Sequence, residues 1–209
     1  RERKDVPRHT ELRADLLTQE EVTHRRQAGL VSAEIGLQTT NKAALRQAGR
    51  AGNPDKVARG VSLLKEAGID VTTGIIVGLP EDTPEDFDRT LQWLKQTDAY
   101  SVVHPFVLAI LPGTDFRASA DHLGLTYDPR PPYYVKSTRT FPADAFRPAL
   151  LECERVFDME LDHISPPSLV DSGPSVTTDP VEARFISKWI VNPNTKTWSR
   201  LLPAVAGKA

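Results

Sequence analysis

Residues 69–81 read IDVTTGIIVGLPE, and this stretch decides the fold class of the chain. The apolar run Ile69–Val77 has the composition of a strand buried on both faces, as in a parallel sheet. Gly74 and Gly78 leave room for a ligand or a second backbone segment, because they carry no side chain. In parallel α/β folds, ligands bind at the carboxyl ends of the strands. The simpler alternative is a strand that ends in a Leu-Pro turn, followed by acidic residues that favour the start of a helix.

Strand-like and helix-like segments alternate on either side of this stretch. Two more apolar runs, Val31–Leu37 and Tyr100–Leu108, and the more polar segment Glu11–Leu16 complete a set of four expected strands. Such alternation is typical of an α/β fold with a parallel sheet and right-handed crossovers. Four strands do not close a barrel, so both edges of the expected sheet are open.

Three of the expected helices have clear start and stop signals. Residues 18–21, Thr-Gln-Glu-Glu, form a capping box, and Gly29 is a natural stop. Asn53 stands before a first-turn proline, and Gly68 ends that helix. Thr83 also stands before a proline and begins the third helix.

The pattern changes after Pro112. Asp115–Leu123 and Ala143–Met159 are expected helices, and a proline-rich turn lies between them. From Ser165 onward, prolines and small polar residues indicate a loosely ordered tail. We therefore expect three parts: a strand-and-helix domain at 10–125, a helical segment at 126–164 and a tail at 165–209.

The composition is that of an ordinary globular protein, with 39% hydrophobic and 26% charged residues. The net charge of −2 provides no basic field for binding nucleic acid. No segment approaches the roughly 18 apolar residues of a membrane span. Cys153 is the single cysteine, so no internal disulfide forms, and we expect a cytoplasmic protein. One thiol also cannot hold an iron–sulfur cluster, which usually needs three or four thiolates.

Polar side chains stand on or after the other expected strands. On the first strand, Glu11, Arg13 and Asp15 alternate on one face, so that face is either wet or part of a polar site. Gln38 begins a polar cluster after the second strand, which can hydrogen-bond a ligand or cap the next helix. His104 on the last strand is more simply a hydrogen-bonded core histidine than a base or a metal ligand.

Taken in order, these segments resemble the radical S-adenosylmethionine (SAM) superfamily, and most of all its branch in which the domain follows a cobalamin-binding domain. The likeness covers about residues 10–160. It implies a partial, TIM-like (β/α) barrel, with a helical and irregular C-terminal extension. This chain would supply roughly the last four of six strands. The segments similar to the consensus of that branch are Glu11–Thr18, Glu34–Asn41, Arg50, Gly74–Asp82, Phe106, Leu111–Thr114 and Gly124–Pro132.

The resemblance implies that nine residues bind SAM. The four from the third strand match the Gly-x-Ile-x-Gly-x-x-Glu pattern, whose isoleucine packs on the adenine. The two from the first strand match positions that meet the methionine end of SAM or the substrate. Gln38, after the second strand, matches a position near the ribose. His104 and Phe106 lie where the backbone of the last strand contacts the adenine. These residues are Glu11, Arg13, Gln38, Gly74, Ile76, Gly78, Glu81, His104 and Phe106.

The departure from the family that matters most is the absence of a Cys-x-x-x-Cys-x-x-Cys loop. In the family, these thiolates hold the 4Fe-4S cluster that cleaves SAM. The resemblance therefore implies three cofactors: SAM, a 4Fe-4S cluster whose ligands are absent from this chain, and cobalamin held by a missing N-terminal domain. The expected partners are a small-molecule substrate and the missing half-barrel, in the same or a neighbouring chain. Alone, the chain is expected to be inactive.

Two other functions stay open at this point. One is a non-catalytic half-barrel that serves as a binding or interaction module. The other is an unrelated (β/α)-barrel enzyme with Glu81 and Asp82 as acid and base, although neighbouring side chains tend to point apart. Three cysteines in the family's spacing just upstream, or in a neighbouring gene, would favour the radical enzyme.

Overall fold

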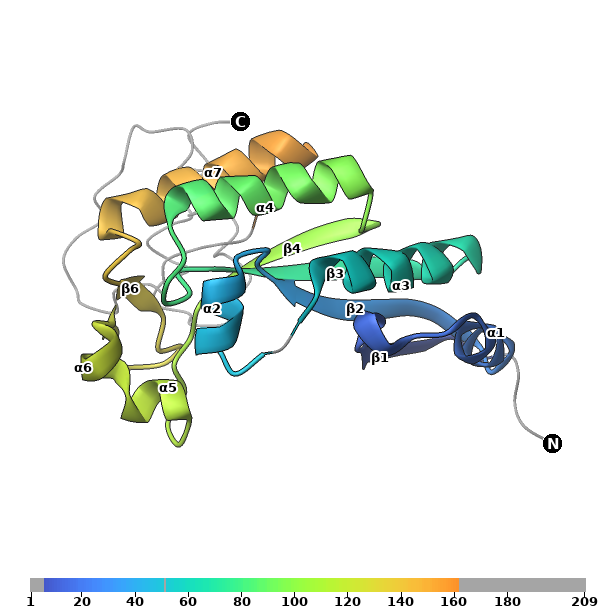
Figure 1. Cartoon of the computed structure of the whole chain (residues 1–209), viewed down its shortest axis with the longest axis horizontal. Helices are drawn as coiled ribbons and strands as arrows, with labels where there is room; N and C mark the ends of the chain where they lie inside the picture. The colour runs from blue at the N-terminus through green and yellow to red at the C-terminus, as the bar shows by residue number, and fades with distance from the viewer. Residues whose placement is uncertain (1–5, 51, 162–209) are drawn as a thin grey trace, which may run out of the picture. The chain divides into compact units, whose positions relative to one another are not determined.

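The computed structural model describes residues 6–50 and 52–161, which contain a sheet of four parallel strands with helices (Figure 1). The strands lie in the order of the chain, which confirms the expected α/β class with four parallel strands. The expected tail at 165–209 lies outside the described residues. In the described ranges, no helix has the length and apolar character needed to cross a membrane. The strands are β1 (Arg8–Leu12), β2 (Leu30–Gln38), β3 (Asp70–Val77) and β4 (Val102–Val107).

Three of the four strand predictions are confirmed, but the first is wrong in its extent. β1 ends at Leu12, and Ala14–Leu16 forms a short 3-10 helix, η1. Ala14 is buried against Gly60, whose missing side chain lets the two backbones approach closely. Because the chain turns there to make this contact, the expected alternation of three charged residues along one strand face does not occur.

The helices between the strands begin and end where their capping residues predict. In α1 (Gln19–Gln27), the Thr18 backbone N–H donates to Glu21 Oε2 at 2.9 Å, and the Glu21 N–H donates to Thr18 Oγ1. Asn41 and Asn53 accept from first-turn N–H groups of α2 (Lys42–Gln47) and α3 (Pro54–Glu66). A second capping box, formed by Thr83 and Asp86, starts α4 (Pro84–Thr97).

The region after the sheet differs from its prediction in two places. The single helix expected at 115–123 is two short helices, because Ser119 interrupts it, and a two-stranded antiparallel sheet follows. Strands of two and three residues carry too little periodicity to be predicted. The last helix packs along α4, as Figure 1 shows. These elements are α5 (Asp115–Ala118), α6 (Ala120–Leu123), β5 (Thr126–Tyr127), β6 (Val135–Ser137), η2 (Ala143–Ala145) and α7 (Phe146–Phe157).

The two faces of the four-stranded sheet have different environments. One face carries fully buried side chains, such as Ile35, Ile75 and Val103, and helices α3 and α7 contact the sheet. The opposite face, here called the open face, is largely exposed or half-buried and mixes charged, glycine and aromatic residues. Successive side chains of a strand point to opposite faces, so alternate residues of each strand lie on alternate faces. The open face consists of Glu11, Glu34, Gly36, Gln38, Thr72, Gly74, Ile76, Val102, His104 and Phe106.

Candidate functional site

The strand register gathers residues that are distant in sequence into rows across the open face. Glu11 of β1 lies beside Glu34 of β2, which lies beside Thr72 of β3. Like charges directly opposite each other are destabilising, because nothing between them offsets their repulsion. In the part of the chain that the structure describes, no ion pair joins either glutamate to a cation. This acidic row is therefore suited to a positively charged group of a ligand.

The next row places two glycines side by side in neighbouring strands. Gly36 of β2 lies beside Gly74 of β3, which lies beside His104 of β4. A Cβ atom at Gly74 would lie 3.3 Å from Cε2 of Phe106, so the ring of Phe106 already extends over this glycine. His104 stacks on the same ring, with centroids 4.1 Å apart. The expectation that His104 is a core histidine is wrong, because its side chain is exposed on the open face.

Ile76 and Phe106 are direct neighbours in β3 and β4 and form the apolar end of the open face. Phe106 is 38% exposed, which is unusual for a large apolar side chain in a sheet. Together with His104 they present a flat surface of the kind on which planar rings stack. A nucleobase fits that chemistry.

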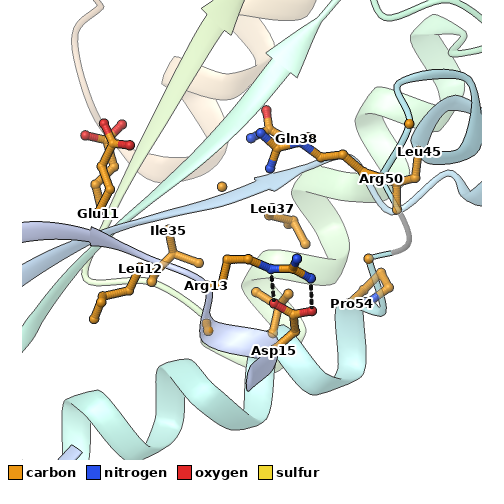
Figure 2. A pocket seen from close by; sticks show the side chains of 16 residues that line it. Glu11, Leu12, Arg13, Asp15, Ile35, Leu37, Gln38, Leu45, Arg50 and Pro54 are labelled. Atoms are coloured by element: carbon orange, nitrogen blue, oxygen red, sulfur yellow. Dashed lines mark hydrogen bonds and ion pairs between the residues drawn. The ribbon is translucent and has the colours of Figure 1, made fainter. Parts of the chain in front are cut away.

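A cavity of about 730 Å³ adjoins the open face at the ends of β1 and β2 (Figure 2). This volume is in the range of small-molecule sites, which are about 300–1,000 Å³. Arg50, which follows α2, and Pro54, the first residue of α3, also line the cavity. The charged and polar residues in its lining are Glu11, Arg13, Asp15, Glu34, Gln38 and Arg50.

Arg13 and Asp15 neutralise one another at the mouth of the cavity. Figure 2 shows the two side chains pointing toward each other, with Arg13 Nη2 donating to Asp15 Oδ2 at 2.7 Å and Nε to Oδ1 at 3.2 Å. The hydrogen bond from Arg13 lowers the pKa of Asp15, although burial acts in the opposite direction. Since Arg13 is engaged in this way, it does not compensate the acidic row.

Gln38 and Arg50 lie together over Gly36. A Cβ atom at Gly36 would clash with Gln38 Nε2 and lie 3.4 Å from Arg50 Nη1. Gln38 has a left-handed backbone (φ 70°), and the register of β2 and β3 shifts at this point. The side chain of Gln38 lies over Gly36 on the open face.

The loop after β2 and the turn after β3 are joined by a buried polar cluster. Asn41 Nδ2 donates to the Glu81 carbonyl oxygen at 2.8 Å and to Asp82 Oδ1 at 3.1 Å, while Asn41 Oδ1 caps α2. Thr39 Oγ1 donates to the same Asp82 oxygen at 3.4 Å, and Thr40 Oγ1 lies 2.9 Å from Thr90 Oγ1 of α4. The proposed helix cap at this position is confirmed as Asn41.

Glu81 and Asp82 have opposite environments. Glu81 is exposed and has a left-handed backbone (φ 67°), whereas the side chain of Asp82 is fully buried. Burial raises the pKa of Asp82 to about 7, although Asn41 and Thr39 donate to it. Because the two carboxyl groups do not share a cleft, the geometry does not favour an acid–base pair made of these two residues.

Gly78 has a packing partner that the sequence does not reveal. Its φ is +84°, and a Cβ atom would lie 2.5 Å from Cζ and 2.6 Å from Cε1 of Phe146 in α7. The space beside this glycine is thus filled by a ring from the region after the sheet.

The structure brings six of the nine predicted binding residues onto the open face; Arg13, Gly78 and Glu81 follow the ends of their strands. Sequence reasoning assigned no role to Glu34, Gly36 or Arg50, although Glu34, Gly36 and Gln38 stand at a spacing of two along one strand. That spacing is the signal that places them on one face.

No described residues form a group of three or more His, Cys, Asp or Glu side chains that could hold a metal ion. Cys153 is buried within α7, where burial raises the pKa of its thiol to about 12. A thiol that resists ionisation and is shielded from solvent is a poor ligand for iron.

Comparison with known proteins gives a match to a family model over part of the chain, and a fold. Residues 3–94 match the sequence model of the radical SAM superfamily. Coproporphyrinogen III oxidase from Escherichia coli, a radical SAM enzyme, aligns with 73% of this chain and 33% of its own, at 21% identity and a TM-score of 0.56. The radical SAM methyltransferase TsrM from Kitasatospora setae, with cobalamin and a 4Fe-4S cluster bound, aligns with 76% of this chain and 36% of its own, at 14% identity and a TM-score of 0.57.

At these identities the two structures show the fold alone, and the chain spans about a third of the length of each. No curated protein gives a significant match.

Proposed function

We propose that this chain, whose residues 3–94 match the sequence model of the radical SAM superfamily, supplies the SAM- and substrate-binding strands of a radical SAM enzyme. One observation carries the proposal: the strand register places six of the nine residues that the family likeness singles out on one open face, beside a cavity of about 730 Å³. Glycines and helix-capping residues with only a structural role would not need to lie together on one face.

The chemistry of the open face matches the parts of SAM. The flat surface of Ile76, His104 and Phe106 suits the adenine. The absence of side chains at Gly36 and Gly74 leaves room over the sheet for Gln38, Arg50 and the Phe106 ring. The amide of Gln38 lies over this glycine row and suits the ribose hydroxyl groups.

The acidic row suits the positively charged end of SAM. The sulfonium and the amine of SAM are cationic, so either group offsets the repulsion between Glu11 and Glu34. Arg50 has no carboxylate partner among the ion pairs of the described residues, which leaves it available to an anionic group.

The described residues do not fit an iron–sulfur cluster, because they provide one buried thiol and no metal-binding group of side chains. The cluster, which supplies the electron for cleaving SAM, belongs in this proposal to the missing half of the barrel. Among the described residues, β1 has a neighbour on one side only, and all of its residues except the half-buried Leu12 are exposed, so its free edge suits the preceding strand of that half.

In this proposal the three parts of the chain keep the ranges expected from sequence. Residues 10–125 form the C-terminal half of the barrel, 126–164 a helical segment after it and 165–209 a tail. The proposal also includes cobalamin on a further N-terminal domain, a small-molecule substrate and a cytoplasmic location. A non-catalytic half-barrel is the second candidate, and the missing cluster ligands favour it if no upstream half exists.

We expect the chain alone to bind no iron–sulfur cluster. Anaerobic reconstitution followed by iron and sulfide assays should give values near zero, and Cys153→Ser should give the same values as wild type. A stoichiometric cluster in the wild-type chain, lost in Cys153→Ser, would contradict this expectation.

Phe106→Ala should weaken SAM binding in the complete barrel about fivefold or more. Stacking between a base and an aromatic side chain contributes ~1–3 kcal/mol, and 1.4 kcal/mol is tenfold in affinity. The measurement is calorimetric titration with SAM. Val6→Ala is the matched control, because Val6 is 50% exposed but stands before the sheet. Equal affinities in Phe106→Ala and wild type would remove the adenine from this surface.

A further inference from the structure

The buried cluster that joins the two binding loops contains an unbalanced carboxyl group. We call Thr39, Asn41, Asp82 and Thr90 the polar clasp. Both donors that reach the side chain of Asp82, from Thr39 and Asn41, bind Oδ1. Oδ2 is buried and has no hydrogen-bond partner among the described residues. Burying a charged oxygen without a hydrogen-bond donor costs free energy. The protonated, neutral carboxyl group avoids this cost.

Among the described residues, no free cation compensates Asp82. The charged groups whose field reaches it are Asp86 and Arg89 of α4, and these two form an ion pair with each other. The side chain of the adjacent Glu81 is exposed. The remaining groups against Asp82 are neutral: Thr39 and Asn41 from the loop after β2, and Thr140, whose hydroxyl donates to the Asp82 carbonyl oxygen at 2.6 Å.

The polar clasp fixes the two loop residues that the proposed function assigns to SAM. Gln38 immediately precedes Thr39, and Asn41 holds the carbonyl oxygen of Glu81. Both Gln38 and Glu81 have left-handed backbones, with φ of 70° and 67°. Non-glycine residues seldom adopt this conformation, which is strained, and the clasp bonds the residue after Gln38 and the carbonyl oxygen of Glu81.

We propose that Asp82 is a positioning residue: in its neutral form it holds the loop after β2 against the turn after β3, and its ionisation loosens this hold on Gln38 and Glu81. Ionisation places a charge on Oδ2, and the turn relieves the cost by moving to admit water. The role in SAM binding rests on the proposed function, whereas the clasp itself does not.

The direction of the pH effect follows from the raised pKa. Burial raises the pKa of Asp82 in the folded chain to about 7, while an unfolded aspartate has a pKa of about 3.9. The folded chain therefore holds this proton more tightly than the unfolded chain does. The resulting stabilisation is complete below about pH 4, is lost as the pH rises to about 7, and does not change further above it.

The first test uses the full chain without any ligand. The ¹³Cγ resonance of Asp82, assigned by its absence in Asp82→Asn, should titrate near pH 7. From pH 5 to pH 8, the thermal unfolding midpoint of wild type should fall by several degrees more than that of Asp82→Asn. About 1 kcal/mol shifts the midpoint of a domain this size by ~2–4 °C. Asp88→Asn, which removes an exposed carboxylate of α4, should follow wild type. Titration of Asp82 near pH 4, or parallel curves for wild type and Asp82→Asn, would overturn the proposal.

The second test measures SAM affinity against pH in the complete barrel. Wild-type affinity should fall severalfold between pH 6 and 8, and that of Asp82→Asn should stay level. A level profile in wild type, with Asp82 titrating near pH 7, overturns the positioning role. Absence of SAM binding at every pH instead overturns the proposed function, and the titration of the ligand-free chain then still decides whether the clasp loosens.

Discussion

Gly60→Ala should destabilise the chain by roughly 3 kcal/mol, at the upper end of the usual cost of overpacking. In a helix interior this substitution normally stabilises by up to ~1 kcal/mol. Here the new Cβ atom would lie 2.7 Å from the carbonyl carbon of Ala14 and closer still to its oxygen. These are backbone atoms of η1, so no side-chain rotation removes the clash. Either α3 or η1 must move.

The measurement is urea unfolding of the full chain, with Ser62→Ala as the control. Ser62 is exposed on the same helix and its substitution should change the free energy of unfolding by less than about 0.5 kcal/mol. Movement of η1 would also displace Arg13 and Asp15, which line the cavity. A free energy of unfolding for Gly60→Ala equal to or above that of wild type would show that the close approach of α3 and η1 is absent in solution.

Gly78→Val should be the most destabilising single substitution at the proposed site, by about 2–5 kcal/mol. Two costs add: ~1–2 kcal/mol for a left-handed backbone, and ~1–3 kcal/mol for the overlap with the Phe146 ring. Gly68→Val is the matched control, because Gly68 has a similar φ of +70° but nothing within 4 Å of its Cβ position. It should show the backbone cost alone. Urea unfolding of the three chains measures the difference.

The second cost can be assigned to Phe146 by a double-mutant cycle. Gly78→Ala should lower the free energy of unfolding less in the background of Phe146→Ala than in wild type, because the ring that it overlaps is gone. The difference should be at least ~1 kcal/mol. Equal costs in both backgrounds would contradict this packing. Because of this ring, Gly78→Val should also disturb the turn after β3 through α7, in addition to any overlap with the nucleoside that the proposed function places there.

Much of the fold follows from local sequence. Thr18, Asn53 and Thr83 define helix starts through side-chain hydrogen bonds to their own first turns, and such short-range chemistry is present before any tertiary contact forms. The runs that became β2, β3 and β4 are apolar enough to be recognised as buried strands. The end of β1 could not be recognised, because it depends on the contact between Ala14 and Gly60, which are far apart in the chain.

The sequence singled out most residues of the candidate site, but not how they lie relative to one another. Alternation along β2 and β3 gives the residues of one face, but only the register shows that Glu11 lies beside Glu34 or that Phe106 lies over Gly74. His104 was expected in the core because a histidine among apolar residues of a strand is usually buried. It is exposed, since the open face has no covering layer among the described residues.

The sequence by itself determined the α/β class, the order of strands and helices, the lack of cluster-binding thiols and the family likeness, because each of these depends on residue type and short spacing. Tertiary structure alone decided which charges meet. It paired Arg13 with Asp15, left Glu11 and Glu34 facing each other, filled the space beside Gly78 with Phe146 and buried Asp82 with one oxygen unpartnered. Burial and long-range neighbours set the pKa and packing cost of a group, and neither can be obtained from its position in the chain.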